Sequence, residues 1–321
     1  MSSKQLTRLL LPIVVESIVS AKRTSHARLV EQLTAVGFMT RKVDPKQDTV
    51  DIEIQVLDKD AACELIAGEA IKFFLASRLS FLRSAQEQPR NAAWQAVEHY
   101  YAAYYAVHFL LRVTGTLLSN LDKSTMDAIG KNLLSGPPTA TIPSGLYSLT
   151  YDESGGTLSL VKNLRRSGGG SHQDAWMLWF QLVAKLQINS QSDPREYASV
   201  ALDLIEHKRF LELSTGHFRP PELRGEINYQ FKGGTWEFEA SAIDSIRKAQ
   251  LAIRQARQGT ISRAHSWEGL VSNNLLVIEL ARSIFCHFAA NNPRSIFRSV
   301  ANKYKTIIES PTEPTTANVV V

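Results

Sequence analysis

Residues 91–115 read NAAWQAVEHYYAAYYAVHFLLRVTG, and this stretch decides the fold class. It is almost wholly apolar and aromatic and has no proline and no glycine before its last residue, so we expect a long helix. Its polar residues are spaced by three and four positions, which places them on one stripe of that helix. The stripe consists of Glu98, Tyr101, Tyr105, His108 and Arg112. Such a stripe is either a buried polar seam satisfied by neighbouring helices or the wall of a binding site.

The sequence on either side predicts more helices and two short hairpins. Apolar periodicity, capping residues and proline positions indicate further helices at residues 1–24, 27–35, 60–84, 123–134, 174–186, 194–213, 240–258, 267–290 and 293–309. Val50, Ile52, Ile54 and Val56 alternate with polar residues, so FMTRKV (38–43) and TVDIEIQVL (49–57) are expected to pair as strands. INYQF (227–231) and TWEFE (235–239) flank a Lys-Gly-Gly sequence and predict a second hairpin.

These elements predict a mainly α protein. We expect a small N-terminal cap of helix plus hairpin at residues 1–59 and a large helical body at residues 60–310. A winged-helix fragment is the alternative interpretation of the first segment. The Gly- and Pro-rich residues 135–170 are expected to form a loop, and residues 311–321 a disordered tail.

Composition narrows the class of protein. The chain has 321 residues, 44% of them hydrophobic and 21% charged, which is typical of a folded globular protein. The net charge is +5, and the excess of Lys and Arg lies in the C-terminal third, which is compatible with contact to nucleic acid. Cys63 and Cys286 lie in apolar helical patterns and are expected to be free thiols. The apolar run near residue 10 is too short to span a bilayer, so we expect a cytoplasmic protein with no membrane partner.

Common catalytic and cofactor motifs are missing from the sequence. It contains no GxxxxGK[ST], GxGxxG, HExxH, CxxC or GxSxG pattern, and its histidines do not pair with cysteines or carboxylates at metal-ligand spacing. The SGGGS at residues 167–171 lacks the lysine of a phosphate-binding loop. We therefore expect no cofactor and no metal site.

The segment EHYYAAYYAVHFLLR (98–112), preceded by another apolar helix, resembles the HEPN superfamily of helical bundles. The resemblance covers residues 60–115. It implies a HEPN-like helical body, in a family that includes metal-independent ribonucleases of toxin–antitoxin, CRISPR and anti-phage systems as well as non-catalytic members that bind partners. Catalytic members carry an Arg followed, after four to six residues, by a His, and two such motifs usually meet across a dimer.

Two places in this chain match that spacing. Four residues separate Arg282 from His287 on a predicted helix, and five separate Arg166 from His172 in a glycine loop, where Arg165 also fits with six between. The chemistry suits these residues, because His can accept and donate protons near neutral pH and Arg can hold a phosphate. The alternative interpretations are a core-edge histidine at position 287 and a loop or helix-capping residue at position 172.

The sequence leaves several functions open. One hypothesis is a component of a bacterial defence or toxin–antitoxin system that acts on nucleic acid, RNA rather than DNA, as a metal-independent endoribonuclease. Another is a non-catalytic scaffold subunit that holds a protein partner or nucleic acid, and a homodimer is compatible with both. A third is a small-molecule or nucleotide sensor whose pocket is lined by Tyr101, Tyr105, His108 and Arg112. Arg224 is expected to point into the same polar stripe.

Overall fold

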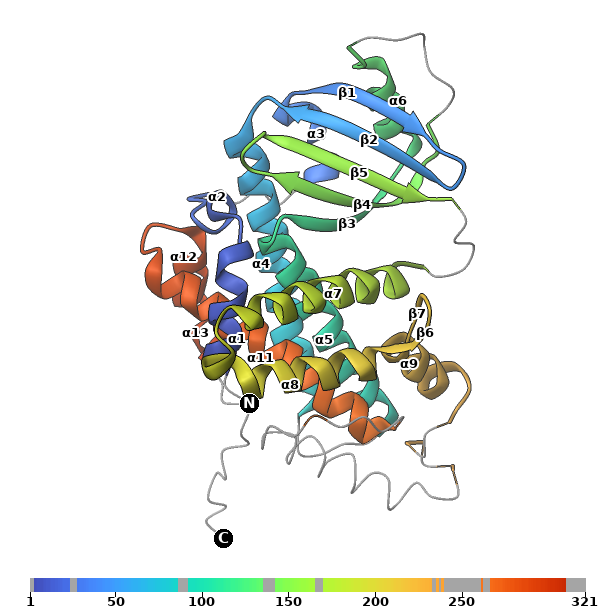
Figure 1. The fold of residues 1–321 in the computed structure, drawn as a ribbon, viewed down its shortest axis with the longest axis vertical. Helices are drawn as coiled ribbons and strands as arrows, with labels where there is room; N and C mark the ends of the chain where they lie inside the picture. Colours follow the sequence, from blue (N-terminus) through green and yellow to red (C-terminus); the bar gives the residue numbers. More distant parts are fainter. Residues whose placement is uncertain are drawn as a thin grey trace.

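The computed structural model describes residues 3–23, 28–85, 92–134, 142–164, 170–232, 235–236, 238–239, 261 and 266–309. Over these residues the chain is mainly helical and contains a five-stranded antiparallel sheet. Figure 1 shows the sheet at one end of the helical body, with strand β3 nearest to the helices.

Two long helices form the centre of the body, α4 (Lys59–Ser84) and α5 (Ala92–Val113). The Asp58 carboxylate accepts a hydrogen bond from the Ala61 amide and so caps the start of α4. The many alanines of α5 let it lie close to α4, and α11 (Trp267–Asn291) packs against both. The rings of Phe74 and Phe285 stack between α4 and α11 with centroids 3.9 Å apart. All three helices follow the predicted ranges closely.

The sheet has the order β1-β2-β5-β4-β3, and every neighbouring pair is antiparallel. Its strands are β1 (Phe38–Pro45), β2 (Thr49–Val56), β3 (Thr116–Leu121), β4 (Gly145–Asp152) and β5 (Thr157–Asn163). The predicted hairpin of β1 and β2 is confirmed. The alternating apolar residues of β2 are buried, which gives the sheet its core-facing side.

Gly115 turns the chain from α5 into β3. Its φ is +76°, and a Cβ at this position would lie 2.8 Å from the backbone oxygen of Tyr151. The Tyr151 amide in turn donates to the Gly115 oxygen at 2.8 Å, so strand β4 is joined directly to the end of α5. This turn brings the edge of the sheet against the C-terminal half of α5.

The remaining helices surround this centre. They are α1 (Ser3–Leu10), α2 (Glu16–Val19), α3 (Leu33–Val36), α6 (Lys123–Lys131), α7 (Gly170–Asn189), α8 (Pro194–Leu211), α9 (Arg219–Tyr229), α12 (Ile296–Lys303) and α13 (Lys305–Glu309). Short 3₁₀ turns lie at Leu11–Ile13, Leu29–Glu31 and Ser190–Ser192, and a small hairpin joins β6 (Glu212–Ser214) to β7 (His217–Phe218). Asp193 caps α8 at the Asp-Pro pair, as its sequence predicts.

Several expectations are wrong in detail. The single helix at residues 1–24 is divided into α1, a 3₁₀ turn and α2, because Pro12 has no amide hydrogen to continue an α-helix. Residues 227–229 of the expected second hairpin belong to helix α9, which begins at Arg219 with Pro220 in its first turn. The helix expected at residues 27–35 is, over its described residues from 28 on, a 3₁₀ turn (Leu29–Glu31) followed by α3 (Leu33–Val36).

The expected loop at residues 135–170 contains strands β4 and β5. Tyr147, Leu149 and Tyr151 alternate with more exposed residues in β4, a pattern that the neighbouring glycines and prolines conceal in the sequence. Strand β3 carries no separate signal in the sequence either, because its apolar residues follow those of α5 almost directly. The predicted helix at residues 240–258 and the expected tail at residues 311–321 lie outside the described residues.

The sheet joins the two expected domains. β2 lies before residue 60 and pairs along its length with β5, which lies in the expected body. The N-terminal hairpin is therefore continuous with a larger sheet, and strands from both sides of the expected boundary share it. Cys63 is buried and Cys286 is half-buried, both as free thiols.

Within the described residues, helix α11 has the length and composition of a membrane span. Most of its apolar window, 72%, is buried inside the protein. Its Phe285 ring contacts phenylalanine rings of α4, α5 and α12, as expected for the central helix of a folded core.

Candidate functional site

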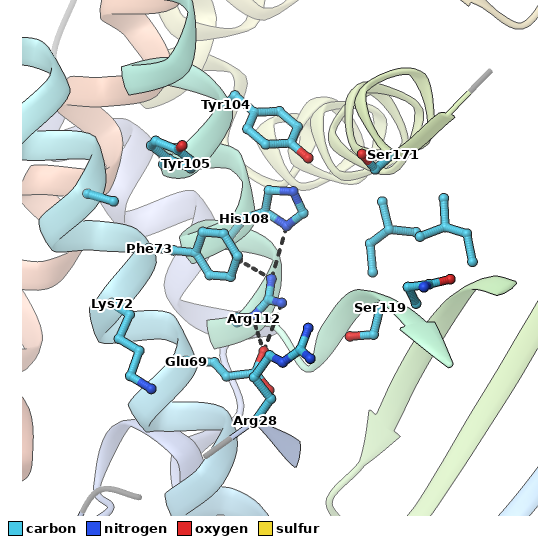
Figure 2. A pocket seen from close by; sticks show the side chains of 14 residues that line it. Arg28, Glu69, Lys72, Phe73, Tyr104, Tyr105, His108, Arg112, Ser119 and Ser171 are labelled. Atoms are coloured by element: carbon cyan, nitrogen blue, oxygen red, sulfur yellow. Dashed lines mark hydrogen bonds and ion pairs between the residues drawn. The ribbon is translucent and has the colours of Figure 1, made fainter. Parts of the chain in front are cut away.

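A cavity of about 520 Å³ lies where the edge of the sheet meets the central helices. Its wall is made by α4, α5, β3 and the start of α7 (Figure 2). One residue before the 3₁₀ turn Leu29–Glu31 and one residue of β4 complete it. The lining residues are Arg28, Glu69, Lys72, Phe73, Ala76, Tyr104, Tyr105, His108, Arg112, Leu118, Ser119, Asn120, Leu146 and Ser171. This volume is within the range of small-molecule sites in proteins.

Helix α5 supplies the central wall of the cavity through Tyr104, His108 and Arg112, which follow one another at four-residue intervals. Tyr105, His108 and Arg112 belong to the stripe expected from the sequence. Tyr101 does not line the cavity, and its place is taken by Tyr104, one turn before His108. One part of the stripe therefore lines the cavity, whereas Tyr101 lies outside it.

A buried ion pair lies at the base of the cavity. Both Nε and Nη2 of Arg112 donate to Oε2 of Glu69, at 3.0 and 2.9 Å, and the two side chains are only 3% and 4% exposed. The other oxygen of Glu69, Oε1, accepts from the Leu29 amide at 2.7 Å. Three donors therefore satisfy the carboxylate, which is the condition for keeping a charge pair inside a protein.

His108 is fixed by Arg112 and by two rings. Nη1 of Arg112 lies 3.0 Å from Nδ1 of His108 and 3.2 Å from the His108 backbone oxygen. The imidazole stacks on Phe73 with centroids 4.6 Å apart and meets Tyr104 edge-on at the same separation. Burial and the neighbouring Arg112 cation hold the pKa of His108 well below its usual value, so the ring is neutral.

The wall is extended by His172, whose ring stacks on Tyr104 with centroids 4.5 Å apart. Nδ1 of His172 lies 2.8 Å from the Tyr100 hydroxyl, which accepts a hydrogen bond from Trp176 Nε1 at 3.2 Å. Burial lowers the pKa of His172 to about 4. Instead of a loop or a capping position before Asp174, this histidine occupies the first turn of α7, which begins at Gly170.

Cations line the open part of the cavity. Lys72 is exposed on α4, and Arg28 faces the cavity while its Nε donates to Glu31 Oε1 at 2.7 Å. The three cations Lys72, Arg28 and Arg112 face the two carboxylates of Glu69 and Glu31, which leaves one net positive charge. The neutral rings of His108 and His172 add none. Ser119 and Asn120 of β3 also line the cavity, and Figure 2 shows Ser119 across it from Lys72.

The other half of the predicted stripe faces α9. Nη2 of Arg224 donates to the Tyr101 hydroxyl at 2.8 Å, and its guanidinium lies over the Tyr229 ring at 5.0 Å. The expectation that Arg224 reaches the stripe is thus confirmed. Glu98 lies a further turn away, where burial raises the pKa of its carboxyl group. Tyr101 and Arg224 thus form a separate polar contact between α5 and α9.

Arg282 and His287, the first candidate catalytic pair, lie on α11. Arg282 Nε donates to Glu279 Oε2 at 2.9 Å, so its charge is compensated along the helix. The His287 ring meets Phe288 edge-on, and no contact between Arg282 and His287 is recorded among the described residues. Of the second pair, Arg166 lies outside the described residues, and His172 joins the aromatic wall.

Some residues of the cavity escape sequence reasoning. Glu69 and Phe73 lie on α4 and meet Arg112 and His108 only through packing of the two helices. The isolated charge in LIAGEAI (65–71), a buried helical pattern, is a signal that could have identified Glu69. Arg28, Ser119 and Ser171 carry no such signal, since they come from three elements far apart in the sequence: a 3₁₀ turn, β3 and α7.

The arrangement can bind an anionic ligand that also has a planar ring. Aromatic faces, cations and the neutral imidazole of His108 border one cavity. Within the described ranges no group of three or more His, Cys, Asp or Glu could hold a metal ion. Tyr104 and Tyr105 are also poor acids, because burial raises the pKa of both hydroxyls.

Comparison with known proteins gives no match to a family model, to a curated protein or to a solved structure. The resemblance of residues 98–112 to the HEPN superfamily therefore stays a prediction from the sequence.

Proposed function

We propose that this protein binds a nucleotide unit, either free or within RNA, in the cavity between α4, α5 and β3. The observation that carries the proposal is the composition of that cavity, in which Tyr104, Tyr105 and Phe73 lie beside the cations Lys72 and Arg28. Nucleotides combine a flat aromatic base with a phosphate, and proteins bind these two parts through ring stacking and cationic groups.

The size and charge of the cavity support this ligand class. A volume of about 520 Å³ is enough for one nucleotide, and the net positive charge favours an anion over a neutral aromatic molecule. Ser119 and Asn120 add polar groups suited to a sugar or a base edge. The basic composition of the whole chain, with a net charge of +5, is compatible with RNA as the source of that nucleotide.

The experiment is calorimetric titration of the protein with AMP, GMP, CMP, UMP and a five-nucleotide RNA in the presence of EDTA. We expect binding of at least one of these, and a loss of about fivefold or more in Tyr105→Leu, which removes a stacking surface. Lys72→Ala should weaken binding by about five- to tenfold. Lys185→Ala is the matched control, because Lys185 is an exposed helical lysine beside a different, much smaller cavity. Absence of binding by every probe would overturn the proposal.

As the wider proposal, the protein belongs to a bacterial defence or toxin–antitoxin system. It acts there as an RNA-binding component or as a scaffold for a partner. Metal-independent cleavage by Arg282 and His287 is the narrower catalytic hypothesis. It is tested with labelled RNA and DNA in EDTA, comparing wild type with His287→Ala and His172→Ala. Cleavage lost in only one variant would identify that histidine as catalytic, whereas intact RNA that remains bound would favour the binding role.

A further inference from the structure

The hydrogen-bond roles of His108 follow from its neighbour. A guanidinium has only N–H donors, so the 3.0 Å contact from Arg112 Nη1 requires Nδ1 of His108 to be the acceptor. Arg112 cannot rotate away easily, because its Nε and Nη2 are held by Glu69 in a pair that is almost fully buried. Nδ1 of His108 is therefore unprotonated and occupied.

The second nitrogen carries the proton of the neutral ring. An imidazole whose Nδ1 accepts a hydrogen bond has its single N–H at Nε2. Figure 2 shows the edge of His108 that is turned away from Arg112 facing the side of the cavity bounded by Tyr104 and Ser171. Stacking on Phe73 and the edge contact with Tyr104 hold the ring in that orientation. The Nε2–H of His108 is thus a hydrogen-bond donor held in a fixed orientation in the central wall of the cavity.

We propose that His108 is the specificity-determining residue of this site, and that its Nε2–H binds a phosphate oxygen of the ligand as a donor without acting as a proton acceptor. This inference rests on the proposed nucleotide site and deepens it, since it names the ligand group that the site reads. In this proposal His108 recognises the ligand and does not act as the base in a cleavage reaction. A general base needs a free acceptor nitrogen, and the only one on His108 is used by Arg112.

His172 has the same arrangement. Trp176 Nε1 can only donate, so the Tyr100 hydroxyl oxygen accepts from it. The hydroxyl is buried and its other described partner is Nδ1 of His172, so its hydrogen is satisfied by donation to that nitrogen. Both histidines stacked on or against Tyr104 thus have their acceptor nitrogen filled by the protein. Two independent hydrogen-bond chains, one from Glu69 and one from Trp176, thus leave neither histidine with a free acceptor at Nδ1. A site for proton abstraction would need such an acceptor.

The first part of the test reads His108 directly. Long-range ¹H–¹⁵N correlation spectra of the ¹⁵N-histidine-labelled full chain at pH 7, assigned by comparison with His108→Gln, should show Nδ1 unprotonated and Nε2 protonated. Addition of inorganic phosphate or of the monophosphates should shift the Nε2–H resonance. An Nδ1–H tautomer, a charged ring or an unmoved resonance at saturating ligand would overturn the proposal.

The second part separates the donor from the ring. His108→Gln keeps an amide donor near the Nε2 position and should retain nucleotide affinity within about threefold, whereas His108→Phe keeps the stacking ring and should lose about tenfold. For nucleosides without a phosphate the two variants should bind equally. His217→Phe, an exposed histidine in β7, is the control. Equal affinity of wild type and His108→Phe for every monophosphate would overturn the inference.

The two proposals fail in different ways. If no nucleotide binds but inorganic phosphate shifts His108 Nε2–H, the nucleotide function is wrong and the oxyanion role of His108 stands. If nucleotides bind and His108 is unaffected by spectrum and by substitution, the site is confirmed and the role of His108 is wrong. If neither phosphate nor nucleotide binds, both proposals fall.

Discussion

At the scale of single residues, the cavity depends on one buried charge pair. Arg112 is oriented by Glu69, and it orients His108 in turn. A charge this deeply buried is tolerated only while its partner remains, because desolvation of an unpaired ion costs far more than loss of a surface contact. The same pair therefore supports both the fold and the hydrogen-bond pattern of the site.

Arg112→Met is expected to lower the free energy of unfolding by about 3–5 kcal/mol, because the Glu69 carboxylate is left buried without its cation. The double variant Glu69→Met/Arg112→Met should recover much of this loss. A deficit of about 1–3 kcal/mol remains in the double variant, since the Leu29 amide still lacks its acceptor. Urea unfolding of the two variants checks this, and an equal loss in the single and the double variant would contradict the expected recovery.

His207 predicts a pH dependence of stability. It is fully buried, accepts from Trp179 Nε1 at 2.9 Å and donates through Nδ1 to Asn273 Oδ1 at 2.9 Å. Burial lowers its pKa to about 4, so between pH 6.5 and pH 4 the unfolded chain binds a proton that the folded protein does not. Stability from this residue is present above pH 6.5 and is lost as pH falls, by about 2 kcal/mol between pH 7.5 and pH 5.

Urea unfolding at several pH values measures this slope. His99, which is also buried and whose pKa burial lowers to about 3, contributes in the same direction. His207→Gln should reduce the dependence of the free energy of unfolding on pH by the contribution of one titrating group. His217→Gln, at an exposed position of β7, should leave that dependence unchanged. A slope that is the same in wild type and His207→Gln would contradict the assignment of a neutral buried imidazole.

At the scale of elements, α5 and β3 behave as one unit joined by Gly115. The turn needs a positive φ and brings the position of a Cβ to 2.8 Å from the Tyr151 oxygen. It also sets where Ser119 and Asn120 of β3 lie relative to His108 and Arg112 of α5. An element boundary that looks local in sequence thus determines the shape of the cavity.

Gly115→Ala is expected to lower the free energy of unfolding by about 1–3 kcal/mol, through backbone strain and the close approach to Tyr151. Gly225→Ala is the matched control. Gly225 lies within helix α9, and a Cβ there would meet nothing within 4 Å. That substitution should raise stability by up to about 1 kcal/mol, because alanine favours helix over glycine. Thermal unfolding of both variants compares them, and destabilisation by both would refute the argument.

At the scale of the whole molecule, the sheet ties the N-terminal segment to the helical body. β2 is covered by β1 on one side and β5 on the other, and Arg28 of the N-terminal segment reaches the cavity. The cavity is thus formed by residues from both expected domains, and neither part of the sequence contains it alone.

A chain of residues 60–321 is expected to lose cooperative unfolding, because removal of β2 exposes the long paired edge of β5 and the apolar side of the sheet. Circular dichroism during urea titration measures this. The control is a chain ending at Glu309, which keeps every described element and should unfold as the full chain does. A cooperative transition in the 60–321 fragment would show that residues 60–310 form a domain by themselves.

The amino-acid sequence by itself determined the mainly helical class, the long helices α4, α5 and α11, and the β1–β2 hairpin, because periodic burial and capping are local properties. It also identified His108, Arg112 and Tyr105 as one polar face. It could not give strands β4 and β5, because glycines and prolines conceal their alternation and their outer neighbours β3 and β2 come from other parts of the chain. It also predicted a hairpin where helix α9 lies. Only the tertiary structure brought Glu69, Phe73 and Arg28 to that face and replaced Tyr101 by Tyr104, since contact between helices is set by the packing of whole elements.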